Sequence, residues 1–148
     1  MLSVRKVAEY LLAKADDSAG DGISNLKLQK LVYYAQGFHL ALHGAPLFAA
    51  PIEAWEHGPV VPELYHAYKH HGSGNIPVPG TFDPESYEKA EAGLLDEVYD
   101  VFGQYSAWKL RDMTHEERPW IEAHQNGEHG RVISHVAMRD YFKDYVTA

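Results

Sequence analysis

The segment from residue 24 to residue 44 constrains the fold of this chain more than any other. Ser24 or Asn25 can cap the start of a helix, and Gly44 stands where a helix commonly ends in a left-handed residue. A helix that is apolar on most sides is normally surrounded by the rest of its domain. We therefore expect this helix at the centre of the fold, because its apolar positions cover more than half of its circumference: Leu26, Leu28, Leu31, Val32, Tyr33, Ala35, Phe38, Leu40 and Leu42.

Helix signals in the rest of the chain predict a mainly α fold. A capping side chain, or a proline at the first helical position, marks each predicted start. The helical spacing also predicts buried positions near the helix ends, among them Val101 and Tyr145. The predicted starts are Ser3, Ser24, Pro62, Asp83, Ser106 and Ser134, with a further short helix near Pro119.

A small β element is expected beside these helices. Apolar and polar residues alternate over 52–55, which predicts a short strand, and residues 131–133 could pair with it. A chain of 148 residues can bury a core without metal or disulfide support. We expect one domain over 1–148, a compact helical bundle of about six helices with a two-stranded β element.

Composition excludes several classes of protein. The chain has no cysteine, which rules out disulfides and thiolate chemistry. Its formal net charge is −8 and its basic residues are scattered, which argues against direct nucleic-acid binding. No apolar run is long enough to span a membrane. Residues 1–5 lead into an amphipathic helix rather than a signal peptide, so we expect a cytoplasmic protein.

The histidines do not form a convincing catalytic or metal-binding motif. His66 and His70 have the i, i+4 spacing of metal ligands, with His71 beside them, but no third ligand is identifiable. His115 precedes a glutamate as in a metalloprotease motif, whose second histidine is absent. We expect no enzyme, no cofactor and no metal. The alternative from another class is a metal-dependent hydrolase using His66, His70 and His115.

Two turn segments combine rigid aromatic side chains with polar neighbours, a combination typical of protein-recognition surfaces. If the two turns lie side by side, they present a groove to a partner. In the other interpretation the tryptophans belong to the core and Gly-Pro only shapes a turn. The candidate partner-binding residues are Trp55, His57, Gly58, Pro59, Val60, Tyr65, Thr114, His115 and Trp120.

Three segments of the chain resemble the Panacea domain family, the phage-associated, SocA-like antitoxins. The first covers residues 24–40, and the second covers 52–65 with its Trp-Glu-His-Gly-Pro run. In the third, Thr114-His115 is followed by Pro119-Trp120, after Ser106-Ala107-Trp108. The three segments follow one another in order over nearly the whole chain, and they are specific in combination.

The resemblance implies a compact helical domain that neutralises a partner protein toxin by direct binding. In one mode of the family, the antitoxin delivers the toxin to a ClpXP-type protease. The toxin is then expected from an adjacent gene, and the resemblance brings no catalytic residues. The alternative among binding proteins is a general proteolytic adaptor or phage-associated regulator without a dedicated toxin.

Overall fold

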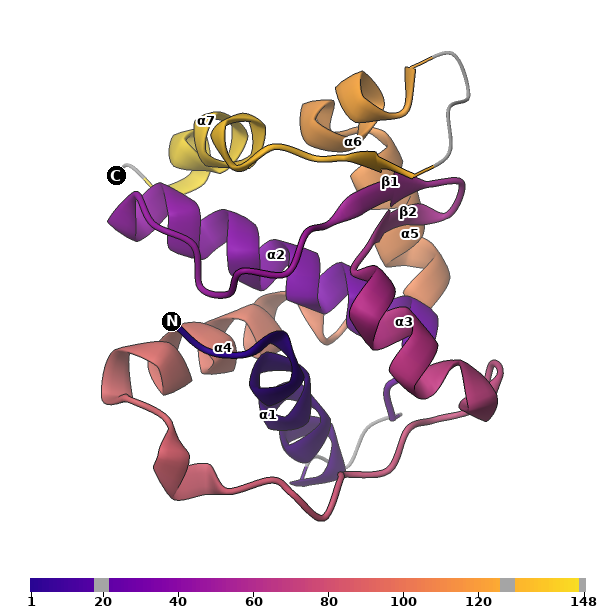
Figure 1. Cartoon of the computed structure of the whole chain (residues 1–148), viewed down its shortest axis with the longest axis vertical. Coiled ribbons are helices and arrows are strands. Elements are labelled where there is room, and N and C mark those ends of the chain that lie inside the picture. Colours follow the sequence, from indigo (N-terminus) through magenta and orange to yellow (C-terminus); the bar gives the residue numbers. More distant parts are fainter. Residues whose placement is uncertain (18–21, 126–129, 147–148) are drawn as a thin grey trace.

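The computed structural model describes residues 1–17, 22–125 and 130–146, and within these the protein is mainly α-helical, as predicted (Figure 1). The described part contains seven α-helices, one more than the expected number of about six. None of them is long and apolar enough to cross a membrane. The helices are α1 (Val4–Asp17), α2 (Asn25–His43), α3 (Pro62–Tyr68), α4 (Lys89–Phe102), α5 (Ala107–His115), α6 (Arg118–Ala123) and α7 (His135–Val146).

Helix α2 lies at the centre of the fold, with α7 on one side of it and α1 and α4 on the other (Figure 1). Its two predicted ends are confirmed. The Ser24 hydroxyl accepts a hydrogen bond from the Lys27 amide at 3.3 Å, and Gly44 is left-handed with φ 69°. The missing side chain of Gly37 lets α7 approach closely, since a Cβ there would lie 2.3 Å from ring atoms of Phe142.

Polar residues of α2 are buried as well, and each of them holds a different segment of the chain. The Gln36 amide donates to Phe48 O at 2.8 Å, and Gln29 Oε1 accepts from the Val61 amide at 2.8 Å. Lys27 Nζ donates to Gly103 O at 2.6 Å. Buried polar groups are costly unless they are paired, so these bonds fix where the connecting segments run over α2.

The β element has three strands instead of the predicted two. Strand β1 (Glu53–Trp55) pairs antiparallel with β3 (Arg131–Val132), which confirms the expected partner. It also pairs with β2 (Gly58–Val60), giving the order β2-β1-β3. Because proline lacks an N–H, it is tolerated mainly on edge strands, and Pro59 lies in such a strand. The sequence prediction interpreted Gly58-Pro59 as a turn and therefore missed strand β2.

The predicted long helix from Asp83 is wrong in its start. Asp83 caps only a 3₁₀ turn, Pro84–Ser86, and α4 begins at Lys89 behind a capping box formed by Glu88 and Glu91. Contacts with α1 explain the interruption. Lys6 Nζ donates to Ser86 O at 2.9 Å, and the Tyr87 hydroxyl donates to Lys6 O at 2.6 Å. These bonds hold the chain against α1 before the helix can start.

Three residues predicted in the core lie at the surface. Leu42 and Val101 are both 51% exposed, and Tyr145 is 64% exposed. They line one groove at the C-terminal ends of α2, α4 and α7. Helical spacing gives the face on which a residue lies, but not whether the neighbouring helix extends far enough to cover it.

Candidate functional site

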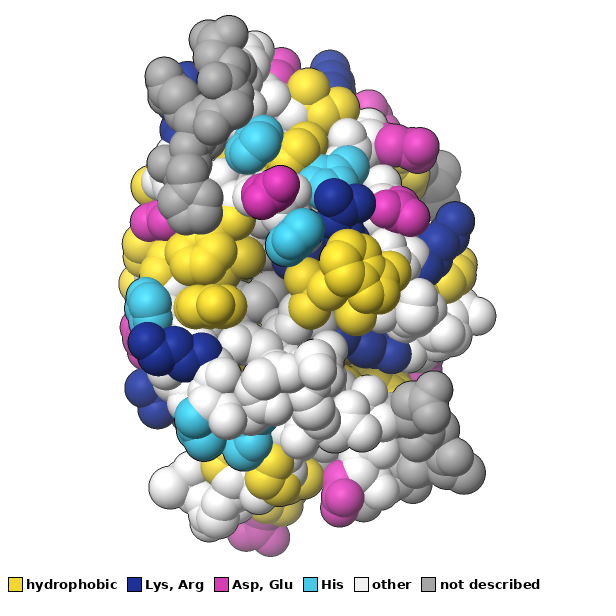
Figure 2. Space-filling view, turned by 90° about the vertical axis from the view of Figure 1, so that its right-hand side faces the viewer, with side chains coloured by type: hydrophobic (Ala, Val, Ile, Leu, Met, Phe, Trp, Pro, Cys, Tyr) yellow, Lys and Arg dark blue, Asp and Glu magenta, His cyan; other side chains and the backbone are white. Residues whose placement is uncertain are grey.

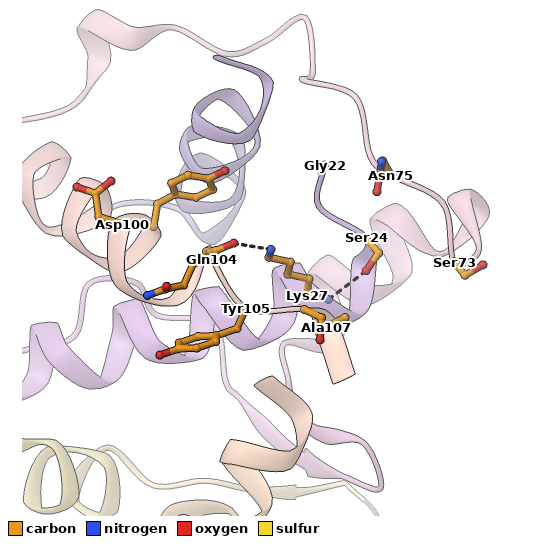
Figure 3. Close-up of a pocket in the computed structure, with 12 residues that line it drawn as sticks. Gly22, Ser24, Lys27, Ser73, Asn75, Asp100, Gln104, Tyr105 and Ala107 are labelled. Carbon is orange, nitrogen blue, oxygen red and sulfur yellow. Dashed lines mark hydrogen bonds between the residues drawn. The ribbon is translucent and has the colours of Figure 1, made fainter. Parts of the chain in front are cut away.

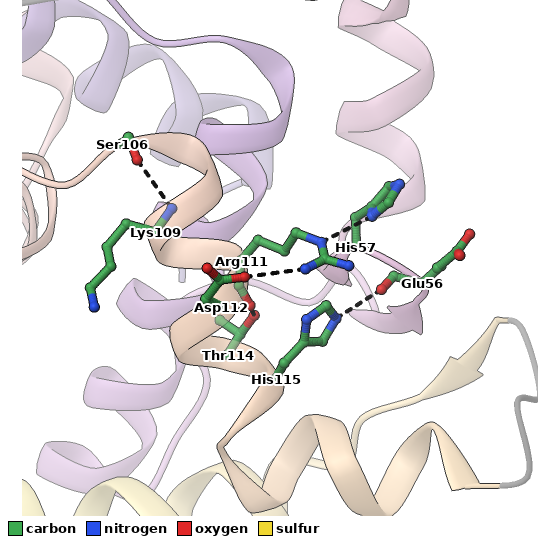
Figure 4. Close-up of polar contacts among 8 residues, drawn as sticks. All are labelled: Glu56, His57, Ser106, Lys109, Arg111, Asp112, Thr114 and His115. Atoms are coloured by element: carbon green, nitrogen blue, oxygen red, sulfur yellow. Dashed lines mark hydrogen bonds and ion pairs between the residues drawn. The ribbon is translucent and has the colours of Figure 1, made fainter.

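The two aromatic turns lie side by side, as the sequence suggested. His115 Nε2 donates to Glu56 O at 2.8 Å, and Trp120 Nε1 donates to Trp55 O at 2.8 Å. Both acceptors are backbone carbonyls, Trp55 at the end of β1 and Glu56 in the turn that follows. His115 is therefore in the tautomer with its proton on Nε2, and burial lowers its pKa. These bonds join the end of α5 and the start of α6 to the β1–β2 hairpin, and Figure 4 shows the bond of His115.

Lys30 lies beneath the β1–β2 turn and is fully buried. Its Nζ donates to Pro59 O at 3.0 Å, and it forms no ion pair within the part of the chain that the structure describes. Burial, with a smaller contribution from the charge of Arg111, lowers the pKa of Lys30 to about 7. A buried ammonium without a carboxylate partner is rare, because removing a charge from water is costly.

Gly58 is required by this arrangement. Its φ is 109°, a region that side chains rarely adopt, and a Cβ would lie 2.6 Å from Lys30 Cε and 2.8 Å from Thr114 Oγ1. The glycine therefore lets the turn close over the Lys30 side chain while Thr114 supports it from α5. The glycine at position 58 is therefore explained by the Lys30 side chain beneath it.

An aromatic groove of about 730 Å³ opens beside this turn. Trp55 and Tyr65 form one wall, with their rings edge to face at 5.0 Å, and Trp108 from α5 contributes another part of the lining. Figure 2 shows this side of the molecule, where hydrophobic and histidine side chains gather. Asn25, Gln29 and Lys30 of α2 also line the groove. We call it the Trp108 groove.

His57, Arg111 and Trp108 form a cluster at the edge of the groove, and Figure 4 shows the contact between His57 and Arg111. Arg111 Nε donates to His57 Nδ1 at 3.1 Å, and the guanidinium carbon lies 5.3 Å from the centre of the Trp108 ring. A ring nitrogen can accept only when it carries no proton, so in this contact the N–H of the His57 ring lies on Nε2. The cluster therefore presents an aromatic face and an N–H donor together.

Glu117 is a buried carboxylate behind the α5–α6 connection. It accepts hydrogen bonds from the Tyr33 hydroxyl at 2.9 Å and from the Tyr34 hydroxyl at 2.7 Å. Burial raises the pKa of Glu117 to about 7, although both hydrogen bonds favour the carboxylate. Because Glu117 is also the residue before α6, this contact fixes the position of Trp120 relative to α2.

The candidate residues differ in how much of them a partner could reach. His57 is exposed, whereas Trp55, Tyr65, His115 and Trp120 are half-buried. Gly58, Pro59, Val60 and Thr114 are buried and support the turn from beneath. Thr114 and His115 belong to the last turn of α5, so their predicted place in a turn segment outside the helices is wrong.

The sequence interpretation missed four residues of this site: Lys30, Trp108, Arg111 and Glu117. Trp108 is 57% exposed, although a tryptophan is usually mostly buried. Its presence in the third matched segment was the signal that could have identified it. No local pattern shows that Lys30 and Glu117 are buried, because their partners lie 29 and 84 residues away.

A polar pocket lies close to the Trp108 groove, between the starts of α2 and α5 and the end of α4 (Figure 3). Ser24 and Ser106 line it, and each caps its own helix. The Lys27 ammonium crosses the pocket to Gly103 O. The capping residues and Lys27 are thus engaged in bonds that hold the fold.

The histidines do not converge as a hydrolase would need. The rings of His70 and His71 lie 4.1 Å apart, whereas His66 packs on Tyr65. In the described ranges, no group of three or more His, Cys, Asp or Glu side chains is placed to hold a metal. Neither His57 nor His115 is hydrogen-bonded to a hydroxyl or carboxylate there, so neither forms the nucleophile–base pair of covalent catalysis.

Comparison with known proteins identifies the family. The chain belongs to the family described as antitoxin SocA-like, Panacea domain, whose model matches residues 28–121. This match confirms the resemblance seen in the three segments. It runs from α2 into α6 and includes every candidate partner-binding residue.

One relative is Antitoxin SocA of Caulobacter vibrioides (strain NA1000 / CB15N), which is 46% identical over 72 residues. The aligned stretch is 48% of this chain and 37% of the relative's length. No solved structure matches the chain significantly.

Proposed function

We propose that this chain is a non-enzymatic antitoxin that neutralises a partner protein toxin by direct binding. The observation that carries the proposal is family membership over residues 28–121, which contain the Trp108 groove's β1–β2 turn and most of its aromatic residues. The name of the relative, an antitoxin, supports the same role.

The geometry supports a binding surface at the Trp108 groove. Its aromatic residues are held by the α2, β1–β2 and α5 packing, and rigid aromatic side chains are frequent hot spots of protein interfaces. Trp108 is 57% exposed and Trp55 and Tyr65 are half-buried, so apolar area remains for a partner to cover. Covering such area is favourable by about 25 cal/mol per Å².

The proposed mechanism follows mass action. A toxin held in the groove is withdrawn from its target as long as antitoxin is in excess of the dissociation constant. A second step, delivery of the held toxin to a ClpXP-type protease, would remove it irreversibly. Both steps belong in the cytoplasm, and we propose that the toxin is encoded by an adjacent gene.

Co-expression with the product of the adjacent gene tests the role. We expect that product to stop growth alone, wild-type chain to restore growth, and Trp108→Ala to fail to restore it. Val136→Ala is the matched control, because Val136 is also 57% exposed but lies on α7. If the adjacent product is harmless alone, or remains toxic with wild-type chain, the antitoxin role is wrong.

The lifetime of the toxin in cells distinguishes neutralisation by binding alone from delivery to the protease. In cells that lack the protease, a toxin that is only held stays neutralised, whereas a toxin that must be degraded becomes active again. Affinity purification adds a second distinction. One stoichiometric partner supports a dedicated antitoxin, and an unfoldase with many substrates supports a general adaptor.

A further inference from the structure

The lining of the Trp108 groove contains many hydrogen-bond donors and few free acceptors. His57 Nδ1 is occupied by Arg111, which leaves the Nε2–H of this exposed residue as a donor. Lys69 is exposed, and neither its ammonium nor the Trp108 indole N–H makes a hydrogen bond within the described residues. These three donors belong to residues that line one groove.

The polar side chains of the groove floor are already paired. Asn25 Nδ2 donates to Tyr65 O at 3.2 Å, and Gln29 Nε2 donates to Asn25 Oδ1 at 2.9 Å. Gln29 Oε1 accepts from the Val61 amide. The floor amides therefore offer little to a donor from a partner, and the partner must instead satisfy the donors at the rim.

The charges of the groove also favour a partner that brings acceptor groups. Glu56 is the single carboxylate among the lining residues, and its side chain points away from His57 and Arg111 (Figure 4). The basic residues are Lys69 at the rim and Lys30 beneath the floor, and Lys30 is buried with no ion pair in the described residues. Arg111 lies behind His57, where its ion pair with Asp112 at 3.2 Å offsets its charge.

This local charge is opposite to that of the chain as a whole. The net charge is −8, so an acidic segment is repelled over most of the surface and attracted at this groove. Because the pKa of Lys30 is lowered to about 7, Lys30 is charged only in part at neutral pH, and a carboxylate bound above it would favour the charged form. An acidic group in the groove would supply the counter-charge that Lys30 lacks.

We infer that the Trp108 groove binds an acidic segment of the partner, in which an Asp or Glu lies next to an apolar or aromatic residue. The carboxylate is held by Lys69 and the N–H groups of His57 and Trp108, over the charge of Lys30. The neighbouring side chain packs against Trp55, Tyr65 and Trp108. This inference rests on the proposed function, since it states the chemistry of the surface that the partner presents.

Selection of random dodecapeptides displayed on phage against the full chain tests the inference. We expect the enriched sequences to carry Asp or Glu beside an aliphatic or aromatic residue. A synthetic copy of an enriched peptide should lose at least about tenfold in affinity when its acids are replaced by Asn or Gln. Enrichment of neutral or basic peptides, or no enrichment, overturns the inference.

Two charge reversals locate the binding. Lys69→Glu should weaken the acidic peptide by at least about tenfold, because it replaces a donor at the rim with a like charge. Lys89→Glu makes the same change of charge on the exposed start of α4 and should leave the affinity unchanged. Equal effects of both variants would mean that only the net charge matters, which contradicts a groove-specific site.

The experiments can contradict this inference and the proposed function independently of each other. If Lys69→Glu still neutralises the adjacent toxin and the toxin binds without an acidic segment, the antitoxin role stands and this inference is wrong. If acidic peptides bind the groove but wild-type chain neutralises no toxin, the groove chemistry stands and the proposed function is wrong.

Discussion

The side-chain nitrogen of Lys30 lies 3.0 Å from the carbonyl oxygen of Pro59, so the central helix holds strand β2 from beneath. This contact explains why glycine and proline stand together at the start of the strand. Gly58 leaves room for the lysine chain, and the carbonyl of Pro59 accepts its hydrogen bond. The β1–β2 hairpin of the candidate site is therefore placed by a buried lysine of α2.

Replacing Gly58 by alanine should destabilise the protein by about 2–4 kcal/mol. An unfavourable φ of this kind costs about 1–3 kcal/mol, and overpacking against Lys30 and Thr114 adds to it. Urea unfolding measures the change. Gly44→Ala is the matched control: its φ is 69°, but a Cβ there would meet nothing within 4 Å. Equal costs for the two variants would show that packing over Lys30 contributes nothing.

Lys30→Met should remove a pH dependence of stability between about pH 7 and pH 10. The folded pKa of Lys30 is lowered from 10.5 to about 7. In this window the unfolded state therefore binds the proton and the folded state does not, so wild-type stability rises with pH. One proton corresponds to at most about 1.4 kcal/mol per pH unit. The difference in unfolding free energy between wild type and variant, measured against pH, should show this slope. A flat difference would mean that Lys30 stays protonated.

Patterns within one element were predictable from the sequence. The caps at Ser24 and Gly44 and the alternation over 52–55 predicted α2 and β1, because each depends on neighbours in the chain. The pairing of β1 with residues 131–133 was also predictable, since few other segments have strand character. The side-by-side placement of the two aromatic segments was one of two interpretations of their composition, and the hydrogen bonds of His115 and Trp120 decided it.

Interactions between distant segments were not predictable in this way. The apolar pattern of α2 does not reveal that its buried surface also contains Lys30, Gln29 and Gln36. Lys30 and Gln29 bond the segment around β2, and Gln36 bonds Phe48. Nor does a cap at Asp83 show that contacts with α1 interrupt the helix after one turn. Such features depend on the tertiary partner, which overrides local propensity.

Glu117→Gln should remove a decrease in the free energy of unfolding with rising pH, between about pH 4.5 and pH 7. Burial raises the folded pKa of Glu117 from 4.5 to about 7, so the folded state binds a proton that the unfolded state has released. The raised pKa of Glu117 therefore stabilises the folded state fully below pH 4.5, its pKa in the unfolded chain, and this stabilisation is lost as the pH rises to 7. Wild-type stability should fall relative to the variant over this range, in thermal unfolding at fixed ionic strength. If the difference rises with pH instead, the carboxylate is stabilised by Tyr33 and Tyr34 more than burial destabilises it.

Trp55→Ala should cost about 2 kcal/mol, less than a fully buried aromatic residue. Trp55 is half-buried and packs edge to face with Tyr65, whereas Phe142 is only 2% exposed. Phe142→Ala should accordingly cost about 3–5 kcal/mol. Denaturant unfolding of both variants gives the order. If the two costs are equal, Trp55 is a core residue and its contribution to a partner surface is small.

His57→Ala and His115→Ala should leave the fold intact and weaken partner binding. His57 is exposed and bonded to Arg111, and the single hydrogen bond of His115 to Glu56 O is worth about 1 kcal/mol. Circular dichroism and unfolding should therefore resemble wild type, while affinity for the co-purified adjacent gene product decreases. His135→Ala, an exposed histidine at the start of α7, serves as the control. If both groove variants unfold, the two histidines are structural, and the assignment of these turns to partner binding is wrong.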